Sequence, residues 1–254
     1  MDSSVWDRFA FKGVICFTGY PDRANRIYDE FARVGLSGVE RFWFSPNVYD
    51  AMLKRAVPLG SYMQKAPAAF AISMHHYCVA KTLLERGAGS VLIFEDDARF
   101  LKDAAYVQEA VRTLPEDYDV AWLDMFPSQQ ARKWPDFVSS IDAAKVDGAP
   151  AWRHARGGFR SAGAYALSRR GLETYVSLLE RGARGEEFCV CDRFLAWLAD
   201  PKFGLRGYVA WPNLAVQAIP KSGACNSGND GLRIGYDYLG ADRSLYAHYE
   251  EDEP

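Results

Sequence analysis

The chain has 254 residues, of which 49% are hydrophobic and 25% charged, and this balance is typical of an ordinary folded domain and not of a disordered chain. A formal net charge of −3, with basic residues spread along the sequence, argues against general nucleic-acid binding. No stretch approaches about 18 uninterrupted apolar residues, so we expect no membrane-spanning helix.

The amino terminus lacks the basic start and apolar run of a secretory signal. The chain contains five cysteines, and an odd number without such a signal favours reduced thiols and a cytoplasmic location. We expect a single domain over residues 1–254, with a core from about 13 to 218. The Gly-, Ser- and Asn-rich composition after residue 218 predicts a partly flexible tail over residues 219–254.

Strands and helices alternate along the first half of the sequence. Apolar runs predict strands at about 14–17, 40–44, 90–94, 119–124, 161–167 and 208–211. Helical periodicity and capping residues predict helices at about 22–34, 67–86, 103–114, 169–182 and 191–198. This alternation favours an α/β fold with a single mixed, mostly parallel sheet flanked by helices.

Three consecutive carboxylates, Glu95, Asp96 and Asp97, end the apolar run that begins at Ser90. One interpretation is a solvated turn after a buried strand. The other is a carboxylate cluster at the carboxyl end of a parallel strand, where open α/β sheets place their ligands. Adjacent negative charges oppose burial unless a cation or water meets them, which makes this stretch the main candidate site.

Three further residue types draw attention, each with a simpler alternative. Arg23 follows the first strand in the first turn of a helix, where α/β folds meet phosphates, although solvent exposure would also explain it. His75 and His76 lie in the middle of a predicted helix, about 100° apart, and packing is the default role of either. Asp192 lies in the first turn of a predicted helix, where a carboxylate also stabilises the helix dipole.

Taken in order, four blocks of this sequence resemble family 25 of the glycosyltransferases, which are lipopolysaccharide galactosyltransferase-like enzymes that the collagen galactosyltransferases also resemble. The blocks are the strand and turn with Asp22-Arg23, the helix with His75-His76, the strand with Glu95-Asp96-Asp97-Ala98, and Ala164-Tyr165-Ala166-Leu167-Ser168-Arg169-Arg170-Gly171. Weaker matches follow at Asp192 and at residues 212–217, so that the resemblance spans roughly residues 13–230.

The resemblance implies a GT-A-type, Rossmann-like fold and transfer of a sugar, galactose in the first instance, from a UDP-linked donor to a glycan, glycolipid or other hydroxyl acceptor, with inversion. It implies Mn²⁺ or Mg²⁺ as cofactor, since hard cations bind one or two carboxylates together with phosphate oxygens and water. It also implies no nucleic-acid partner, and it is compatible with peripheral membrane association.

The resemblance implies a role for each candidate residue. Asp97 is the expected metal ligand, and Asp192 is the expected general base that removes the proton of the acceptor hydroxyl. The expected donor-binding residues are Glu95, Asp96, Thr18, Arg23, His76 and Lys221.

Two other functions remain open from the sequence. A sugar nucleotidyltransferase would use similar carboxylates and metal, but it would have a glycine-rich loop of which residues 18–23 are a poor version. A non-catalytic carbohydrate-binding protein on a glycosyltransferase fold is the second alternative. Release of nucleoside diphosphate from a sugar nucleotide separates transfer from both.

Overall fold

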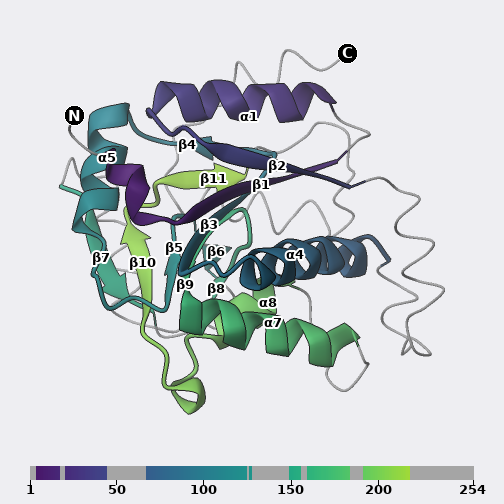
Figure 1. Cartoon of the computed structure of the whole chain (residues 1–254). Helices are drawn as coiled ribbons and strands as arrows, with labels where there is room; N and C mark the ends of the chain where they lie inside the picture. The colour runs from purple at the N-terminus through teal and green to yellow at the C-terminus, as the bar shows by residue number, and fades with distance from the viewer. Residues whose placement is uncertain are drawn as a thin grey trace.

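The computed structural model describes residues 4–17, 21–44, 67–124, 126–127, 149–155, 159–183 and 191–217. The strands of the main sheet are β1 (Phe11–Phe17), β2 (Val39–Phe44), β3 (Ser90–Glu95), β5 (Val120–Trp122), β7 (Ala151–His154), β9 (Ala164–Ser168) and β10 (Gly207–Trp211). The helices are α1 (Pro21–Arg33), α4 (Pro67–Glu85), α5 (Ala104–Thr113), α7 (Arg169–Ala183) and α8 (Cys191–Trp197), with short 3-10 helices η1 (Val5–Arg8) and η3 (Pro201–Phe203). Two small ladders, β4 (Ala98–Phe100) with β11 (Ala215–Gln217) and β6 (Phe126–Pro127) with β8 (Phe159–Arg160), accompany the main sheet (Figure 1).

The main sheet has seven strands in the order β2-β1-β3-β9-β5-β10-β7. β1 pairs in parallel with β2 and β3, and β5 pairs in parallel with β10. β9 is antiparallel to both of its neighbours, β3 and β5, and β7 is antiparallel to β10. Five strands therefore run in one direction and two in the other, which confirms the prediction of one mixed, mostly parallel sheet.

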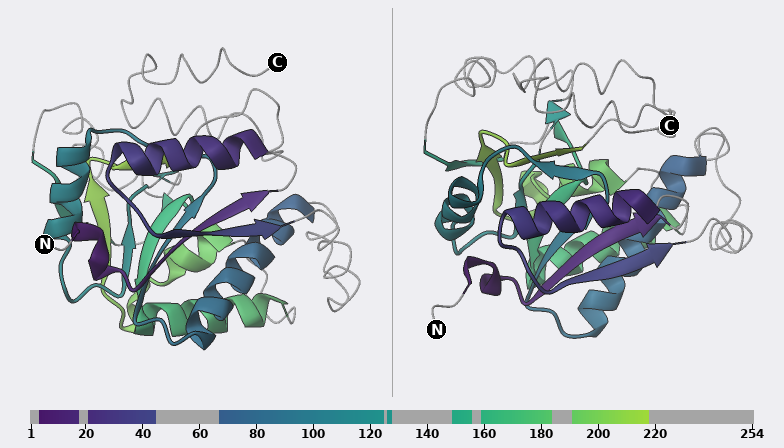
Figure 2. Two further views of the ribbon diagram at one scale, coloured as in Figure 1. Left: turned by 45° about the horizontal axis from the view of Figure 1, so that its top comes forward. Right: turned by 90° about the horizontal axis from the view of Figure 1, so that it is seen from above.

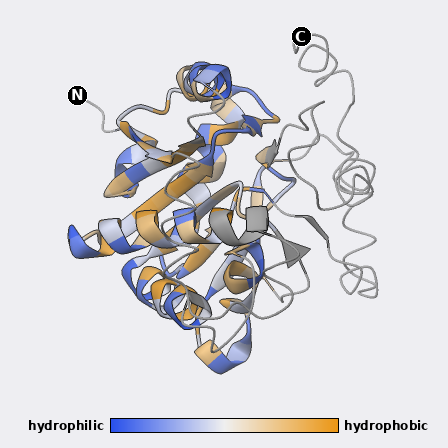
Figure 3. Ribbon diagram, turned by 90° about the vertical axis from the view of Figure 1, so that its right-hand side faces the viewer, coloured by the Kyte–Doolittle hydropathy of each residue, from blue (hydrophilic) through white to orange (hydrophobic). Residues whose placement is uncertain are grey.

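The sheet has a separate hydrophobic core on each face. Because side chains alternate along a strand, Val91 and Ile93 of β3 pack into one core while Leu92 and Phe94 pack into the other. The first core is covered by α4, α7 and α8, and the second by α1, α5 and η1. Figure 2 shows α1 over one face and α4 with α7 against the other, and Figure 3 shows the apolar strands between these layers.

Most predicted elements are present, with boundaries that local hydrogen bonds explain. The helix predicted from residue 103 begins at Ala104 because Asp103 is its N-cap, whose carboxylate accepts a hydrogen bond from the Tyr106 amide at 2.9 Å. The strand predicted over 161–167 begins only at Ala164 because residues 161–163 form a turn, in which the Ser161 hydroxyl accepts from the Gly163 amide. The edge strand β7 was not predicted, since its side chains are mostly exposed and show no apolar alternation.

The block Ser168-Arg169-Arg170-Gly171, which contributes strongly to the family resemblance, joins β9 to α7 and fastens both to the residue before β5. The Ser168 amide donates to the Asp119 carbonyl at 3.0 Å, and the Ser168 hydroxyl donates to the Asp119 carboxylate at 3.1 Å. The Gly171 amide in turn donates to the Ser168 hydroxyl at 3.2 Å, so Ser168 caps α7 as its sequence position predicts. A Cβ at position 171 would lie 2.0 Å from the Asp119 carbonyl oxygen, so only glycine fits there.

We expect Gly171→Ala to lower the free energy of unfolding by about 1–3 kcal/mol, because backbone atoms at Asp119 have to move to admit the methyl group. Gly89→Ala is the matched control, since a Cβ there meets nothing within 4 Å, and its effect should stay within about 0.5 kcal/mol. Urea unfolding followed by circular dichroism measures both. Equal stability of the two variants would show that the close approach at Gly171 is not a constraint.

Candidate active site

The carboxyl ends of β3 and β5 lie on either side of the first residues of β9. The Glu95 amide donates to the Gly163 carbonyl at 2.8 Å, and the Leu123 amide donates to the Ala164 carbonyl at 3.0 Å. The acidic residues that follow β3 and β5 are therefore held against the same short segment of chain. This is the edge of the sheet at which open α/β folds bind ligands.

Arg23 joins the acidic residues of β3 to the start of α1. Its guanidinium lies 2.9 Å from Asp96 Oδ1 and 2.9 Å from Asp97 Oδ2. The Asp96 side chain is fully buried, whereas those of Arg23 and Asp97 are 16% and 15% exposed. Helix α1 follows β1, which pairs with β3, so the first turn of α1 is carried to the acidic end of β3. The structure thus brings Arg23, Asp96 and Asp97 together.

Backbone contacts fix the chain just beyond the acidic residues. The Arg99 guanidinium donates to the carbonyl oxygens of Asp96 and Ala98, at 3.3 and 2.7 Å. The amide of Phe100 donates to the buried carboxylate of Glu30 in α1 at 2.9 Å. The turn between β3 and β4 is therefore held by side chains from α1 and from β4 itself.

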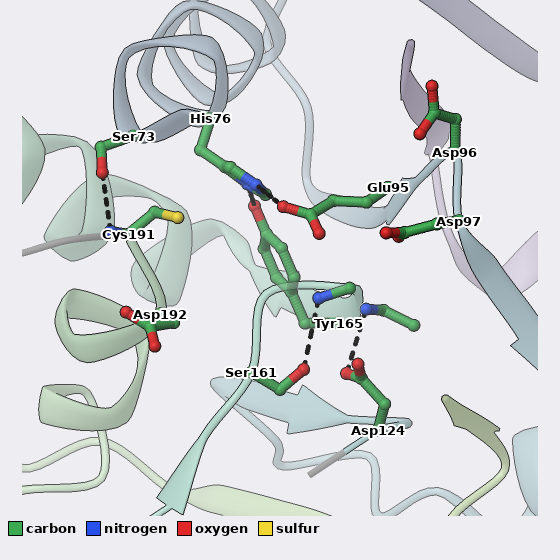
Figure 4. Close-up of polar contacts among 12 residues, drawn as sticks. Ser73, His76, Glu95, Asp96, Asp97, Asp124, Ser161, Tyr165, Cys191 and Asp192 are labelled. Carbon is green, nitrogen blue, oxygen red and sulfur yellow. Dashed lines mark hydrogen bonds and ion pairs between the residues drawn. The ribbon is translucent and has the colours of Figure 1, made fainter. Parts of the chain in front are cut away.

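Asp124 belongs to the same cluster, although the sequence reasoning did not include it among the site residues. It is 1% exposed and follows β5, and its Oδ1 accepts a hydrogen bond from the Ala164 amide at 3.0 Å. The negative charges of Glu95 and Asp97 each raise the pKa of Asp124, so the three carboxylates act on one another. Figure 4 shows Glu95, Asp97 and Asp124 in one close-up around the start of β9. The sequence feature that could have identified Asp124 is the strand predicted over 119–124, which also ends on a carboxylate.

The carboxyl groups of Asp97 and Asp124 are costly to ionise in this setting. The pKa of each is raised to about 7, with burial as the largest cause and the charges of neighbouring carboxylates as a further cause. The Arg23 guanidinium opposes this shift at Asp97, and hydrogen bonds from Ser161 and Ala164 oppose it at Asp124. Within the described residues, Asp97 Oδ1 and Asp124 Oδ2 are buried and have no hydrogen-bond partner.

These two oxygens fit a divalent cation. Carboxylate oxygens are the ligands that Mg²⁺ and Mn²⁺ prefer, and a cation would lower the cost of keeping both groups ionised. The described residues hold no group of three His, Cys, Asp or Glu side chains arranged as a complete metal site. Mg²⁺ usually takes only one or two protein carboxylates and completes its shell with phosphate oxygens and water.

His76 lies beneath the cluster and does not reach the surface. Its side chain is fully buried, and its Nε2 lies 3.0 Å from Glu95 Oε1 while its Nδ1 lies 2.8 Å from the Tyr165 hydroxyl. Its neighbour His75 points elsewhere and stacks on Phe44 with ring centroids 4.1 Å apart. The structure therefore places His76 next to Glu95, with both ring nitrogens already engaged.

Asp192 lies in the first turn of α8, as predicted, and is half-buried. Its Oδ1 accepts a hydrogen bond from the Arg193 amide at 2.7 Å, which is the helix-stabilising arrangement that the sequence allowed. The preceding residue, Cys191, donates its amide to the Ser73 hydroxyl of α4 at 2.9 Å. In the view of Figure 4, Tyr165 lies between Asp192 and the carboxylates of Glu95 and Asp97.

Two predicted donor-binding residues, Thr18 and Lys221, lie outside the described residues, as does the predicted tail over 219–254. None of the described helices is long and apolar enough to cross a membrane.

A cavity of about 800 Å³ lies at the opposite end of β3, where Ser90, Arg8 and Tyr118 contribute to its lining. The Arg8 guanidinium there already binds the carbonyl oxygens of Val111 and Leu114 at the end of α5, so it is committed to a structural role. The carboxyl end of β3 is the better candidate active site, because buried carboxylate oxygens there have no hydrogen-bond partner among the described residues.

No protein-family model and no curated protein sequence matches this chain. Similar solved structures include A197 from STIV, at 11% identity and a TM-score of 0.39, with 83% of this chain and 86% of that chain covered. The galactosyltransferase LgtC, solved with donor and acceptor sugar analogues, gives 12% identity, a TM-score of 0.41 and coverage of 96% and 97%. The glycosyltransferase GlyE of Streptococcus pneumoniae TIGR4 gives 9% identity and a TM-score of 0.43, and 94% of this chain spans 63% of that one. At identities and TM-scores this low, the similarities do not establish a shared activity.

Burial of His75 should make stability depend on pH. Desolvation, followed by the charge of His76, lowers the pKa of His75 from 6.5 to about 4. Between these values the unfolded chain binds a proton that the folded chain does not, so this contribution is fully present above pH 6.5 and is lost as pH falls toward 4. The stability lost by about pH 5 should amount to about 2 kcal/mol in the free energy of unfolding.

Comparison with His75→Phe isolates this effect, because Asp97 and Asp124 have raised pKa values and change stability in the opposite direction with pH. We expect the variant, relative to the original protein, to gain about 2 kcal/mol in unfolding free energy between about pH 8 and about pH 5. Urea unfolding at the two pH values measures this difference. A difference independent of pH would contradict the assignment.

Proposed function

We propose that this protein is a metal-dependent glycosyltransferase of the GT-A type that moves a hexose from a nucleotide-diphosphate sugar to a hydroxyl acceptor. The observation that carries the proposal is a pair of buried oxygens, Asp97 Oδ1 and Asp124 Oδ2, which accept no hydrogen bond from any described residue and lie at the carboxyl edge of the sheet, on the side of Arg23. The family 25 resemblance makes UDP-galactose the first donor to test and a glycan or glycolipid the first acceptor. It also favours inversion at the anomeric carbon.

Asp97 and Asp124 would hold Mn²⁺ or Mg²⁺ between them. Bound there, the cation would neutralise the charge that develops on the departing diphosphate. Asp97 is the ligand expected from the sequence, and we add Asp124 as a second ligand because its Oδ2 is buried without a hydrogen-bond partner among the described residues. Phosphate oxygens of the donor and water would supply the remaining ligands.

Arg23 would contact the donor diphosphate. A guanidinium binds phosphate oxygens with paired N–H donors, and this one lies at the start of a helix, where the dipole also favours an anion. Asp96 is fully buried and bound to Arg23, so we propose that it acts on the donor by orienting this guanidinium. The contact that Asp96 makes with the donor would then be indirect.

Asp192 is the proposed general base. An inverting transfer needs a group that accepts the proton of the attacking hydroxyl, and such a group contributes about 10²–10⁴-fold to the rate. Asp192 is half-buried, and the hydrogen bond from the Arg193 amide fixes one carboxylate oxygen.

Product analysis tests the function directly. Incubation with UDP-galactose, MnCl₂ and a panel of sugar acceptors should release UDP and form a glycoside. Release of pyrophosphate from a nucleoside triphosphate and a sugar phosphate would instead identify a nucleotidyltransferase. Binding of sugars with neither reaction, across a broad panel of donors, would identify a non-catalytic carbohydrate-binding protein.

The metal site has its own prediction. In the original protein, MnCl₂ with UDP at about 100 times their dissociation constant should raise the melting temperature by about 5–10 °C, because ligands that bind only the folded state stabilise it. Asp97→Asn and Asp124→Asn should each lose most of this shift, since each removes a charged ligand.

Glu173→Gln is the matched control, because this carboxylate is exposed on α7 and pairs with Arg169. It should keep the full shift in a thermal-denaturation assay. Shifts of equal size in all four proteins would exclude Asp97 and Asp124 as the metal ligands.

The base has a separate prediction. Asp192→Asn should lower kcat by about 10²–10⁴-fold, because the amide cannot accept the proton, while the affinity for UDP stays within about threefold. Steady-state kinetics and calorimetry measure the two quantities. Asp200→Asn is the control, since Asp200 caps η3 and asparagine also caps helices. Near-normal turnover of Asp192→Asn would remove Asp192 from this role.

A further inference from the structure

His76 is the centre of a chain of buried hydrogen bonds that begins inside the α4–α7 core and ends at the candidate site. Its Nδ1 meets the Tyr165 hydroxyl at 2.8 Å, and its Nε2 meets Glu95 Oε1 at 3.0 Å. The ring of Tyr175 packs against that of Tyr165 with centroids 6.0 Å apart, and the Tyr175 hydroxyl donates to the Cys191 carbonyl at 3.5 Å. His76, Tyr165 and Tyr175 are all completely buried.

The donors in this chain all point toward Glu95. An ionised carboxylate only accepts hydrogen bonds, so Nε2 of His76 donates to Glu95. In a neutral imidazole Nδ1 then accepts, and its donor is the Tyr165 hydroxyl. Tyr165, His76 and Glu95 therefore form a chain of hydrogen bonds with one direction. The bond to Glu95 thus selects the His76 tautomer with the proton on Nε2, and that tautomer selects the orientation of the Tyr165 hydroxyl.

The same face of α4 also holds the beginning of α8. Ser73 precedes His76 by three residues and lies on the same side of the helix. Its hydroxyl accepts the Cys191 amide at 2.9 Å, and Tyr175 contacts the Cys191 carbonyl at 3.5 Å. One turn of α4 therefore contacts both the acidic end of β3 and the helix that carries Asp192.

From this arrangement we propose that His76 is a positioning residue that fixes the orientation of the Glu95 carboxylate toward the sugar-nucleotide donor, with Tyr165 fixing His76. The proposal rests on the function proposed above and assigns His76 an indirect role in donor binding. A direct contact would require a ring nitrogen that is already bound to Tyr165 or Glu95 to change partner. Ser73, three residues before His76, holds the start of α8 through its hydrogen bond with the Cys191 amide.

Packing alone does not account for three polar side chains in this core. A buried hydroxyl or imidazole costs free energy unless its hydrogen bonds are satisfied, so apolar residues of similar shape would fill the space as well. Outer partners that orient a functional side chain typically contribute about 10–100-fold to binding or activity. A loss of this size in the KM for the donor, without a change in the KM for the acceptor, distinguishes a positioning role from a packing role.

Three substitutions at position 76 separate the two roles. Glutamine places an N–H donor near the position of Nε2 and can still reach Glu95, whereas asparagine is too short and phenylalanine has no donor. We expect His76→Gln to keep the KM for UDP-galactose within about tenfold, and His76→Asn and His76→Phe to raise it about 10–100-fold, with the acceptor KM unchanged. His75→Gln is the matched control, because His75 stacks on Phe44 in the next position of the helix, and its donor KM should be unchanged.

Equal effects of glutamine and asparagine, or equal changes in the donor and acceptor KM, would overturn the proposal. A second measurement needs no turnover and separates this proposal from the proposed function. In ¹⁵N-labelled protein, the His76 ring should give the signals of the Nε2–H tautomer, and Tyr165→Phe should shift the Nδ1 resonance. Observation of the Nδ1–H tautomer would overturn the positioning role, whether or not the protein transfers sugar.

Discussion

The burial of carboxylates at the carboxyl edge of the sheet is the constraint on which the rest of this structure depends. Asp97 and Asp124 each carry a buried oxygen that no described residue hydrogen-bonds, and the pKa of both is raised to about 7, chiefly by burial. Such an arrangement works against folding, because a carboxylate removed from water loses hydration that its partners have to replace. Proteins keep costly polar groups of this kind where chemistry requires them.

Two hydrophobic cores hold this unfavourable edge in place. Each large apolar side chain that they bury contributes about 1.5–3 kcal/mol, so the strands stay fixed although their ends carry like charges. The helices then supply the polar contacts that shape the edge. Arg23 comes from α1 on one face of the sheet, and His76 comes from α4 on the other. The candidate site is thus organised by side chains that reach it from both layers.

The sequence predicted those parts of the fold and site that depend on local patterns. Periodicity located the main helices and strands, and the apolar run before Glu95 placed the three carboxylates at a strand end, with Arg23 in the turn that faces them. Asp124 was not assigned to the site, although a predicted strand ends on it, because its neighbours depend on β9 inserting antiparallel between β3 and β5, some seventy residues later in the chain than β3. The roles of Tyr165 and Ser73 depend on the same long-range pairing and on the packing of α7 and α8 against α4.

The Ser168–Gly171 block, which supported the resemblance to family 25, has a structural explanation in its contacts with Asp119.

The most direct test of this account is an anomalous-diffraction measurement on crystals soaked with MnCl₂ and UDP. The account predicts one manganese peak within coordination distance of Asp97 Oδ1 and Asp124 Oδ2, with the diphosphate of UDP on its open side and Arg23 turned toward the phosphates. A manganese peak elsewhere in the protein, or bound UDP with Arg23 still bridging Asp96 and Asp97 and no metal between Asp97 and Asp124, would contradict it.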